Sequence, residues 1–319
     1  MRSRRGAPDR PPRLPRGRVE PEIGCRPVPT WSFEAEEGAA RSANLKVGWG
    51  RTSVRRVRIA TWNVNSVTAR LERLLAWLES AQPDVLALQE LKCSTDAFPT
   101  MPVQALGYEV AALGSGRWNG VALLSRVGLD EVTLGLTGQP QYEGADEPRA
   151  VGATCGGVRV WSVYVPNGRE PDHDHYRYKL DWFGALRATV RADLATHPER
   201  ALAVVGDFNV APTDADVWDI SQFQGSTHVT PAERAALADL REIGLQDVMP
   251  RALKGEPYTF WDYRQAAFGR GWGMRIDLVY ANAAFAARVA DAYVDREERK
   301  GKGASDHAPL VVDLDEARP

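Results

Sequence analysis

Seven short polar segments of this chain each lie next to an apolar, strand-like run and carry a carboxylate, an amide, a phenol or an imidazole. They are residues 62–65, 88–92, 118–121, 164–168, 206–209, 275–277 and 305–307. Hydrolysis of a phosphodiester requires a Lewis acid at the phosphate, an aligned and deprotonated water, and donors for the charge on the phosphate oxygens. Side chains of these types supply each of those parts. The set therefore predicts a phosphodiesterase site at one edge of paired sheets.

A metal site is predicted around Glu90. This residue ends a buried strand expected over 84–89, where an unpaired carboxylate is costly, so it is either a metal ligand or the ion-pair partner of Lys92. Asn65 and Asp306 also follow strand-like runs and can complete an oxygen-rich shell for Mg²⁺, which takes few protein ligands. We predict Glu90 as the principal ligand, supported by Asn65 and Asp306, with Mn²⁺ as the alternative cation.

Asp207 and Asn209 stand at alternate positions just after the apolar run 201–205, so both side chains can face one cleft. Asp207 is predicted to orient and deprotonate the attacking water, and Asn209 is predicted to donate to the phosphate oxygens. An isolated Asp-Phe-Asn sequence would instead indicate a turn stabilised by side-chain caps. The other six segments favour the catalytic interpretation.

Asp277 interrupts an otherwise apolar strand, and a buried carboxylate requires a partner, for which His307 is the obvious choice. In that pair Asp277 would fix the imidazole and favour its charged form, so that His307 can donate to the scissile phosphate. A lone histidine would more simply be a satisfied core residue. Tyr164 and Asn167 flank the turn at Val165-Pro166, which follows another apolar strand. Each is predicted to form a hydrogen bond with a phosphate oxygen.

An aromatic stretch with interleaved arginines covers residues 258–275 and suits either an apolar pocket beside a phosphate track or the protein core. Trp118 is expected in the core, and Asn119 is expected to anchor the site. The Asp-His-Asp-His sequence at 172–175 lacks the spacing of metal ligands, so we interpret it as a solvated loop.

In their order along residues 57–314, these segments resemble those of the exonuclease III family of abasic-site DNA endonucleases. The resemblance implies an α/β fold, the four-layered α/β sandwich of two packed mixed β-sheets flanked by helices. The catalytic residues that it implies are Tyr164, Asp207, Asn209, Asp277 and His307, with Glu90 at magnesium and Asn63 in a supporting hydrogen-bond role. Family members cut DNA 5′ to an abasic sugar in base excision repair, and some also trim 3′ ends.

The expected partner is therefore double-stranded DNA with abasic sites or 3′ ends. The residues predicted to contact it are Asn167, Phe260, Trp272, Met274 and Ile276. Met274 stands where relatives often have an aromatic residue in the abasic pocket, which leaves the balance between endonuclease and exonuclease activity open. Ser66 stands where many relatives have glycine.

Two other functions stay open. One is a phosphodiesterase of the same fold that acts on a non-DNA substrate of the inositol phosphate or sphingomyelin type. The other is a catalytically silent DNA-binding module, which would be expected to lack a metal or water residue. Glu90, Asp207, Asp277, Asp306 and His307 are all present, so an enzyme is favoured.

Charge and periodicity divide the chain into two regions. Residues 1–58 contain 13 Arg and 1 Lys against 6 Asp and Glu, a net charge of +8, whereas the remainder has 26 basic and 36 acidic residues, a net charge of −10. Residues 1–56 are rich in Arg and Pro without apolar periodicity, so we expect a disordered extension. Residues 57–316 are expected to form the catalytic domain.

The catalytic domain is expected to mix strands and helices. Strands are predicted at 57–62, 84–89, 108–113, 119–125, 129–136, 149–154, 158–165, 201–205, 275–281, 288–294 and 308–313, and helices at 70–78, 176–195 and 231–241. No apolar run is long enough to cross a bilayer, and three widely spaced cysteines fit free thiols. A monomer in a bacterial cytoplasm, associated with the nucleoid when on DNA, is expected.

Overall fold

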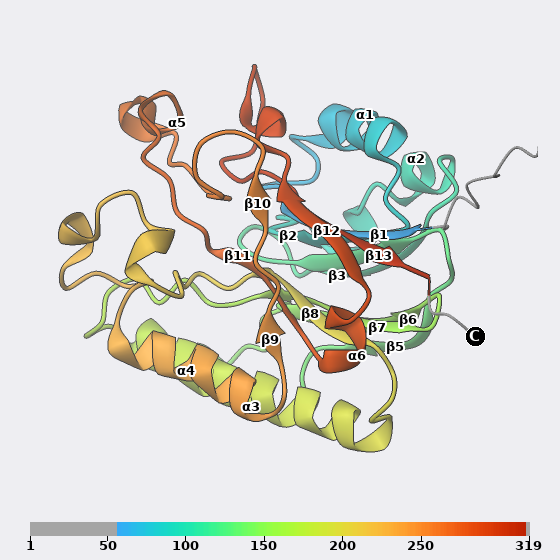
Figure 1. The fold of residues 1–319 in the computed structure, drawn as a ribbon, viewed down its shortest axis with the longest axis horizontal. Coiled ribbons are helices and arrows are strands. Elements are labelled where there is room, and N and C mark those ends of the chain that lie inside the picture. Colours follow the sequence, from blue (N-terminus) through green and yellow to red (C-terminus); the bar gives the residue numbers. More distant parts are fainter. Residues whose placement is uncertain (1–55, 317–319) are drawn as a thin grey trace, which may run out of the picture. The chain divides into compact units, whose positions relative to one another are not determined.

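The computed structural model describes residues 56–316, which form two mixed β-sheets packed face to face with helices on both outer faces (Figure 1). The seven-stranded sheet has the order β10 (Arg251–Ala252), β12 (Val289–Val294), β13 (Leu310–Asp315), β1 (Arg56–Asn63), β2 (Val85–Gln89), β4 (Val121–Ser125) and β3 (Glu109–Leu113). The six-stranded sheet has the order β5 (Asp130–Leu134), β6 (Ala150–Cys155), β7 (Val158–Tyr164), β8 (Leu202–Asp207), β11 (Asp277–Ala281) and β9 (Gln246–Asp247).

Helices complete the outer layers. The α-helices are α1 (Leu71–Ala81), α2 (Thr100–Gln104), α3 (Asp174–Thr196), α4 (Pro231–Glu242), α5 (Ala267–Arg270) and α6 (Ala283–Ala286). Short 3₁₀ helices are η1 (Thr95–Ala97), η2 (Asp214–Asp216), η3 (Ile220–Phe223), η4 (Arg264–Ala266) and η5 (Arg296–Arg299). No helix in the part of the chain that the structure describes has both the length and the apolar character of a membrane span.

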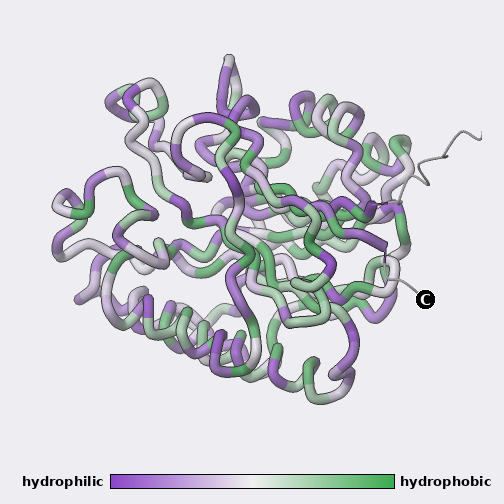
Figure 2. Tube along the Cα trace, in the orientation of Figure 1, coloured by the Kyte–Doolittle hydropathy of each residue, from purple (hydrophilic) through white to green (hydrophobic). Residues whose placement is uncertain are grey.

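The central core lies between the two sheets. Ile59 and Val85 of the seven-stranded sheet belong to one buried cluster with Val160, Val205 and other residues of the six-stranded sheet. Because helices cover the opposite faces, central strands such as β2 and β8 are buried on both sides and consist of continuous apolar runs. Figure 2 shows this hydrophobic character along the strands, with polar residues alternating along the outer helices.

Local sequence explains how the outer helices begin and pack. The Thr230 side chain accepts from the N–H of Glu233, the Glu233 carboxylate accepts from Thr230, and Pro231 occupies the first turn, so α4 starts with a capping box. Leu237 and Leu240 of α4 then pack in one cluster with residues of α3 and of the six-stranded sheet. On the other side, residues of α1 cover the seven-stranded sheet.

The predicted α/β sandwich is confirmed, and each predicted strand and helix is present with ends shifted by a few residues. The predicted disorder of residues 1–56 concerns a segment of which only Arg56 is within the described residues, where it begins β1. Cys93 and Cys155 are buried free thiols. Cys25 lies outside the described residues.

Gly206 allows β8 to deliver Asp207 to the edge of its sheet. Its φ is +146°, and an added Cβ would lie 2.0 Å from the carbonyl oxygen of Val163 on the neighbouring strand β7. No side chain fits at that distance without a shift of the backbone. Glycine is therefore required where β7 and β8 approach each other, one residue before the carboxylate of Asp207.

Replacing Gly206 by alanine should lower the free energy of unfolding by on the order of 3 kcal/mol, because the new methyl group meets backbone atoms. Urea unfolding of the purified protein measures the change. Gly184→Ala is the matched control, since its new methyl group would have no neighbouring atom within 4 Å and the position is in the interior of α3. That control should gain up to about 1 kcal/mol from helix propensity. Equal effects of the two substitutions would contradict the steric explanation.

Candidate active site

Strand register aligns three of the predicted site residues on adjacent strands. Tyr164 at the end of β7 pairs with Asp207 at the end of β8, where these strands run parallel. Asp207 in turn pairs with Asp277 at the start of β11, where the strands run antiparallel. A phenol and two carboxylates therefore reach the same edge of the six-stranded sheet.

The side chain of Asn63 connects this edge to the other sheet. Asn63 ends β1, is fully buried, and donates from Nδ2 to both Glu90 Oε1 and Asp207 Oδ2, each at 2.9 Å. β1 and β2 run parallel, and Glu90 follows the end of β2. One amide therefore holds carboxylates from both sheets next to each other.

Asp277 and His307 form the predicted pair. His307 Nδ1 lies 2.7 Å from Asp277 Oδ2, and His307 Nε2 lies 3.8 Å from Asp207 Oδ2. Burial opposes the positive charge, but the carboxylate of Asp277 outweighs it and raises the pKa of His307 to about 10. The imidazole is thus a buried cation at neutral pH, able to donate from Nε2 toward the cleft.

The environment of Asp207 favours its protonated form. Burial is the main cause, and the carboxylates of Asp277 and Glu90 add to it, so the pKa of Asp207 rises to about 7 despite the opposing charge of His307. The N–H of Asn209 donates to Asp207 Oδ1 at 2.9 Å and fixes the carboxylate. A carboxylate with this pKa is suited to proton exchange near neutral pH.

Glu90, Asp207 and His307 provide ligand atoms within 4.8 Å of one another, the one such acidic and histidine group among the described residues. Burial opposes ionisation of Glu90, but the charge of Lys92 at 2.8 Å and the donor of Asn63 keep the pKa of Glu90 below its ordinary value. An ionised, partly exposed carboxylate beside a second carboxylate fits a divalent cation.

The other predicted ligands are joined to Glu90 through Lys92. Lys92 Nζ donates to Asn65 Oδ1 at 2.6 Å, and Asn65 Nδ2 donates to Asp306 Oδ1 at 2.9 Å. In this arrangement Lys92 occupies the space between Glu90 and Asn65. A cation bound there would compete with an ammonium group for the same oxygens.

Two amides and a histidine form the next part of the cleft. Asn209 Nδ2 donates to the carbonyl of Val165 at 3.0 Å, which leaves its second N–H for a ligand. Asn167 Nδ2 lies 3.4 Å from Asn209 Oδ1 and 3.5 Å from His228 Nε2, so both of its N–H groups already have long contacts. Asn167 can donate to a phosphate only by exchanging one of them.

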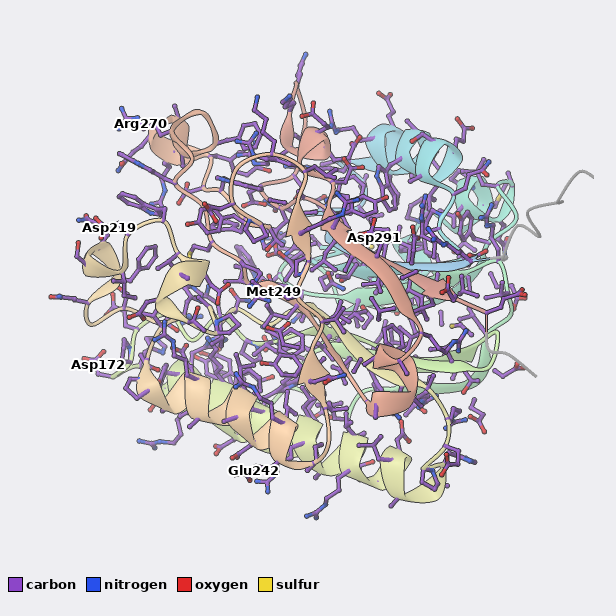
Figure 3. All side chains as sticks on the ribbon, in the orientation of Figure 1. Asp172, Asp219, Glu242, Met249, Arg270 and Asp291 are labelled. Atoms are coloured by element: carbon purple, nitrogen blue, oxygen red, sulfur yellow. The ribbon has the colours of Figure 1, made fainter. Side chains whose placement is uncertain are left out.

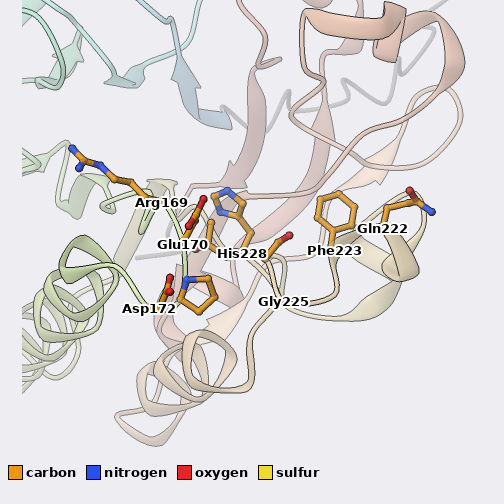
Figure 4. A pocket seen from close by; sticks show the side chains of 10 residues that line it. Arg169, Glu170, Asp172, Gln222, Phe223, Gly225 and His228 are labelled. Carbon is orange, nitrogen blue, oxygen red and sulfur yellow. The ribbon is translucent and has the colours of Figure 1, made fainter.

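His228 carries no sequence motif and was missed by reasoning from the sequence. Its Nδ1 lies 2.5 Å from the carbonyl oxygen of Asn209, so Nδ1 bears the proton and Nε2 is the acceptor that faces Asn167. Burial and the charge of Lys179 lower the pKa of His228 to about 4, which keeps the ring neutral. It lines an open pocket of about 650 Å³ between Arg169 and Phe223 (Figure 4).

A second cavity of about 290 Å³ lies beside the Asp277–His307 pair. Phe260, Trp272 and Met274 line it, together with Trp218, Phe223, Asp262, Arg264, Gln265 and Ala267. The ring of Phe260 is 4.9 Å from that of His307, and Trp218 stacks on Trp272 at 4.6 Å. Arg270 and Asp219, labelled in Figure 3, mark the outer ends of the two segments that carry these tryptophans.

The placement of Ile276 differs from the prediction. Ile276 is 3% exposed and does not line this cavity; it packs with Ala211 and Val217 and directly precedes Asp277, the first residue of β11. Its apolar side chain is used for packing, so we correct its predicted role from substrate contact to support of the cavity wall.

The Endonuclease/Exonuclease/phosphatase family model matches residues 60–307 of the chain. The chain belongs to this family. The predicted family resemblance, and with it the prediction of an enzyme, is confirmed.

Several relatives of known structure or curated function share nearly the whole described domain. The 3′ phosphatase NExo from Neisseria, solved with a product DNA hairpin, is 38% identical with a TM-score of 0.77, and the match covers 82% of this chain and 100% of that chain. An AP endonuclease from Archaeoglobus fulgidus is 34% identical with a TM-score of 0.75 and the same coverage. Exodeoxyribonuclease III of Haemophilus influenzae is 27% identical over 271 residues, which are 81% of this chain and 100% of the relative.

Two further predictions are wrong. Trp118 is 76% exposed rather than in the core, because it lies on the loop between β3 and β4. The neighbouring Asn119 anchors that loop, since its backbone carbonyl oxygen accepts from the N–H of Lys92 at 2.9 Å. The 172–175 sequence is not a solvated loop throughout, since His173 caps α3 and His175 is buried, where its Nδ1 accepts from Gly168.

A buried ion pair between Lys179 and Glu233 supports the backbone of Asn167 and Asn209. Lys179 Nζ donates to the carbonyl oxygens of Asn167 and Asn209, at 3.1 and 2.8 Å, and to Glu233 Oε1 at 2.5 Å. Both charged side chains are fully buried. Burial opposes ionisation of Glu233, but Lys179 and the donors around the carboxylate lower the pKa of Glu233 to about 2.

Glu233→Gln should lower the free energy of unfolding at neutral pH by about 3–5 kcal/mol, because it leaves Lys179 buried without a counter-charge. The pKa of Glu233 is lower in the folded protein than its ordinary value of 4.5, so the stabilisation is complete above about 4.5 and is lost as pH falls toward 2. Urea unfolding of both proteins at about pH 7, 5 and 3.5 should show a difference that shrinks with acidity. Glu242→Gln, an exposed change on the same helix, is the control. If the difference in the free energy of unfolding between wild type and Glu233→Gln did not change with pH, the charge on Glu233 would not be its cause.

Proposed function

We propose that this chain is a metal-dependent DNA phosphodiesterase of base excision repair that cuts 5′ to abasic sites and also acts at 3′ ends. The observation that carries the proposal is that Glu90, Asp207 and the Asp277–His307 pair converge at one place where the two sheets meet. The relatives point in the same direction, since they include an AP endonuclease, an exodeoxyribonuclease III and a 3′ phosphatase that is also described as a 3′-5′ exonuclease.

In this proposal Asp207 orients the attacking water and accepts its proton. Its raised pKa and the fixing hydrogen bond from Asn209 suit that role. His307, charged and held by Asp277, donates from Nε2 to a phosphate oxygen, and the remaining N–H of Asn209 and the hydroxyl of Tyr164 add further donors. Donors fixed before the substrate binds stabilise the charge that develops on the phosphate.

Glu90 would be the principal ligand of a divalent cation, with Asn65 and Asp306 in support, and this oxygen-rich set suits Mg²⁺, with Mn²⁺ as the alternative. When bound, the cation supplies Lewis acid stabilisation of the phosphate charge. Lys92 would have to leave the oxygen atoms of Glu90 and Asn65 to make room.

The cavity beside His307 suits an extrahelical abasic sugar. It is walled by Phe260, Trp272 and Met274, and it opens next to the group proposed to contact the scissile phosphate. A sugar without a base costs little to unstack and would leave room for these side chains. The guanidinium of Arg270 lies over the ring of Trp272 and adds a cation near this cavity that fits the phosphates of a nucleic acid.

The proposal predicts metal-dependent incision of a duplex that carries one stable abasic analogue. Wild-type protein with Mg²⁺ should make a single cut 5′ to the analogue, and EDTA should abolish it. Glu90→Ala and His307→Ala should each slow the cut by at least about 100-fold, because each removes a charge-stabilising group. Glu199→Ala and His197→Ala remove an exposed carboxylate and an exposed imidazole distant in the fold and serve as controls.

An undamaged duplex in parallel distinguishes the alternatives. Stepwise shortening of that duplex without the single cut would make 3′ exonuclease the main activity. Cleavage of neither duplex would contradict a DNA phosphodiesterase and favour a non-DNA phosphodiester. Binding without cleavage would favour the silent DNA-binding module.

Phe260→Ala should weaken abasic discrimination more than it weakens backbone cleavage. The ring lines the cavity but carries no charge and no hydrogen-bonding group for the phosphate. The ratio of cleavage rates on abasic and undamaged duplexes is the measurement, and we expect it to fall by about tenfold. Equal losses on both duplexes would remove Phe260 from the sugar pocket.

A further inference from the structure

Arg149 is a buried cation beside the candidate site. It directly precedes β6 and is 5% exposed, so its guanidinium is unavailable to the phosphates of a ligand. Taking a guanidinium out of water costs several kcal/mol unless partners offset it. Its location in the protein therefore requires an explanation other than direct binding of DNA.

The contacts of Arg149 converge on Tyr164. Nη1 donates to the carbonyl oxygen of Tyr164 at 3.2 Å, and the backbone N–H of Tyr164 donates to the carbonyl oxygen of Arg149 at 2.8 Å. The guanidinium carbon also lies 4.8 Å from the centroid of the Tyr164 ring, which is the geometry of a cation–π interaction. Arg149 thus contacts both the backbone and the ring of one residue.

Glu147 supplies the counter-charge. Its Oε2 accepts from Arg149 Nε at 2.6 Å. Burial opposes ionisation of Glu147, but the charge of Arg149 outweighs it and keeps the pKa of Glu147 below its ordinary value. The cation and its partner are therefore both charged, and the guanidinium carbon is held over the ring of Tyr164.

We propose that Arg149 is a positioning residue for Tyr164, holding the phenol at the cleft and making its hydroxyl a stronger hydrogen-bond donor to the phosphate. The inference rests on the proposed function, in which Tyr164 contacts the phosphate. A positive charge on the face of the ring withdraws electron density from the phenol oxygen, which strengthens its O–H as a donor. Burial and the carboxylates of Glu90 and Asp207 raise the pKa of the Tyr164 hydroxyl well above its ordinary value, and the charge of Arg149 acts in the opposite direction.

A double-mutant cycle tests whether Arg149 acts through Tyr164. Cleavage of the abasic duplex is measured with enzyme in excess for wild type, Arg149→Met, Tyr164→Phe and the double variant. Arg149→Met should slow cleavage about tenfold in the wild-type background and by less than about twofold when Tyr164 is already phenylalanine. An equal loss in both backgrounds would mean that Arg149 only stabilises the sheet, and it would overturn the proposal.

A conservative variant and a spectroscopic measurement cover the case in which Arg149→Met folds poorly. Arg149→Lys keeps a cation beside Glu147 but lacks the planar face, so it should restore the melting temperature more fully than the cleavage rate. In protein with ¹³C at the phenol carbon of tyrosine, the Tyr164 resonance, assigned by its loss in Tyr164→Phe, should move in both Arg149 variants. An unmoved resonance would overturn the proposal even if no DNA substrate is cleaved.

The outcomes separate this inference from the proposed function. Suppose that wild type cleaves the abasic duplex, that Tyr164→Phe cleaves it slowly, and that the effects of Arg149→Met and Tyr164→Phe on the rate are additive. In that case only the positioning role of Arg149 fails. If wild type does not cleave DNA but the Tyr164 resonance moves, the positioning of the phenol stands and the DNA substrate is wrong.

Discussion

The hydrogen bonds from a single buried amide, that of Asn63, hold the site together. Asn63 lies at the end of β1 in the seven-stranded sheet and donates to Glu90 of its own sheet and to Asp207 of the other. Two carboxylates that repel each other are thereby kept within one cleft. The remaining polar groups depend on this junction, because His307 faces Asp207 and Asp277 faces His307. A small relative movement of the sheets would separate the carboxylates and disrupt the whole set.

Buried charges beneath the cleft are compensated in pairs, and these pairs support the parts of the site that face a ligand. Lys179 with Glu233 supports the backbone of Asn167 and Asn209, and Arg149 with Glu147 supports Tyr164. Such pairs add little stability over an apolar core, but they are costly to break and hold their neighbours in one arrangement. Catalysis of phosphoryl transfer depends mainly on positioning and fixed charge, so a rigid polar base under the donors is suited to it.

Predictions from the sequence succeeded where one strand ends in one functional group. Asp207 and Asp277 interrupt apolar runs that can only be buried strands, and a buried carboxylate must find a partner, which made the pair of Asp277 with His307 predictable. They failed where side-chain direction depends on a loop. Trp118 is apolar but exposed, Ile276 belongs to the same segment as Asp277 but points into a packed cluster, and His175 is buried by the start of a helix. His228 belongs to no sequence motif, and its contacts are with Asn167 and Asn209, which are distant from it along the chain.

The sequence by itself determined the elements and the chemical groups at their ends. Apolar periodicity and burial of carboxylates are local properties, and they were enough to predict two sheets, the helices and the acidic and imidazole groups of the cleft. Only the tertiary structure decided which of these groups form hydrogen bonds with one another and which are held by Lys92, Lys179 or Arg149. It also decided which aromatic side chains line a cavity. Those relationships depend on distances of a few ångströms between residues that the chain separates widely, and the packing of the two sheets sets those distances.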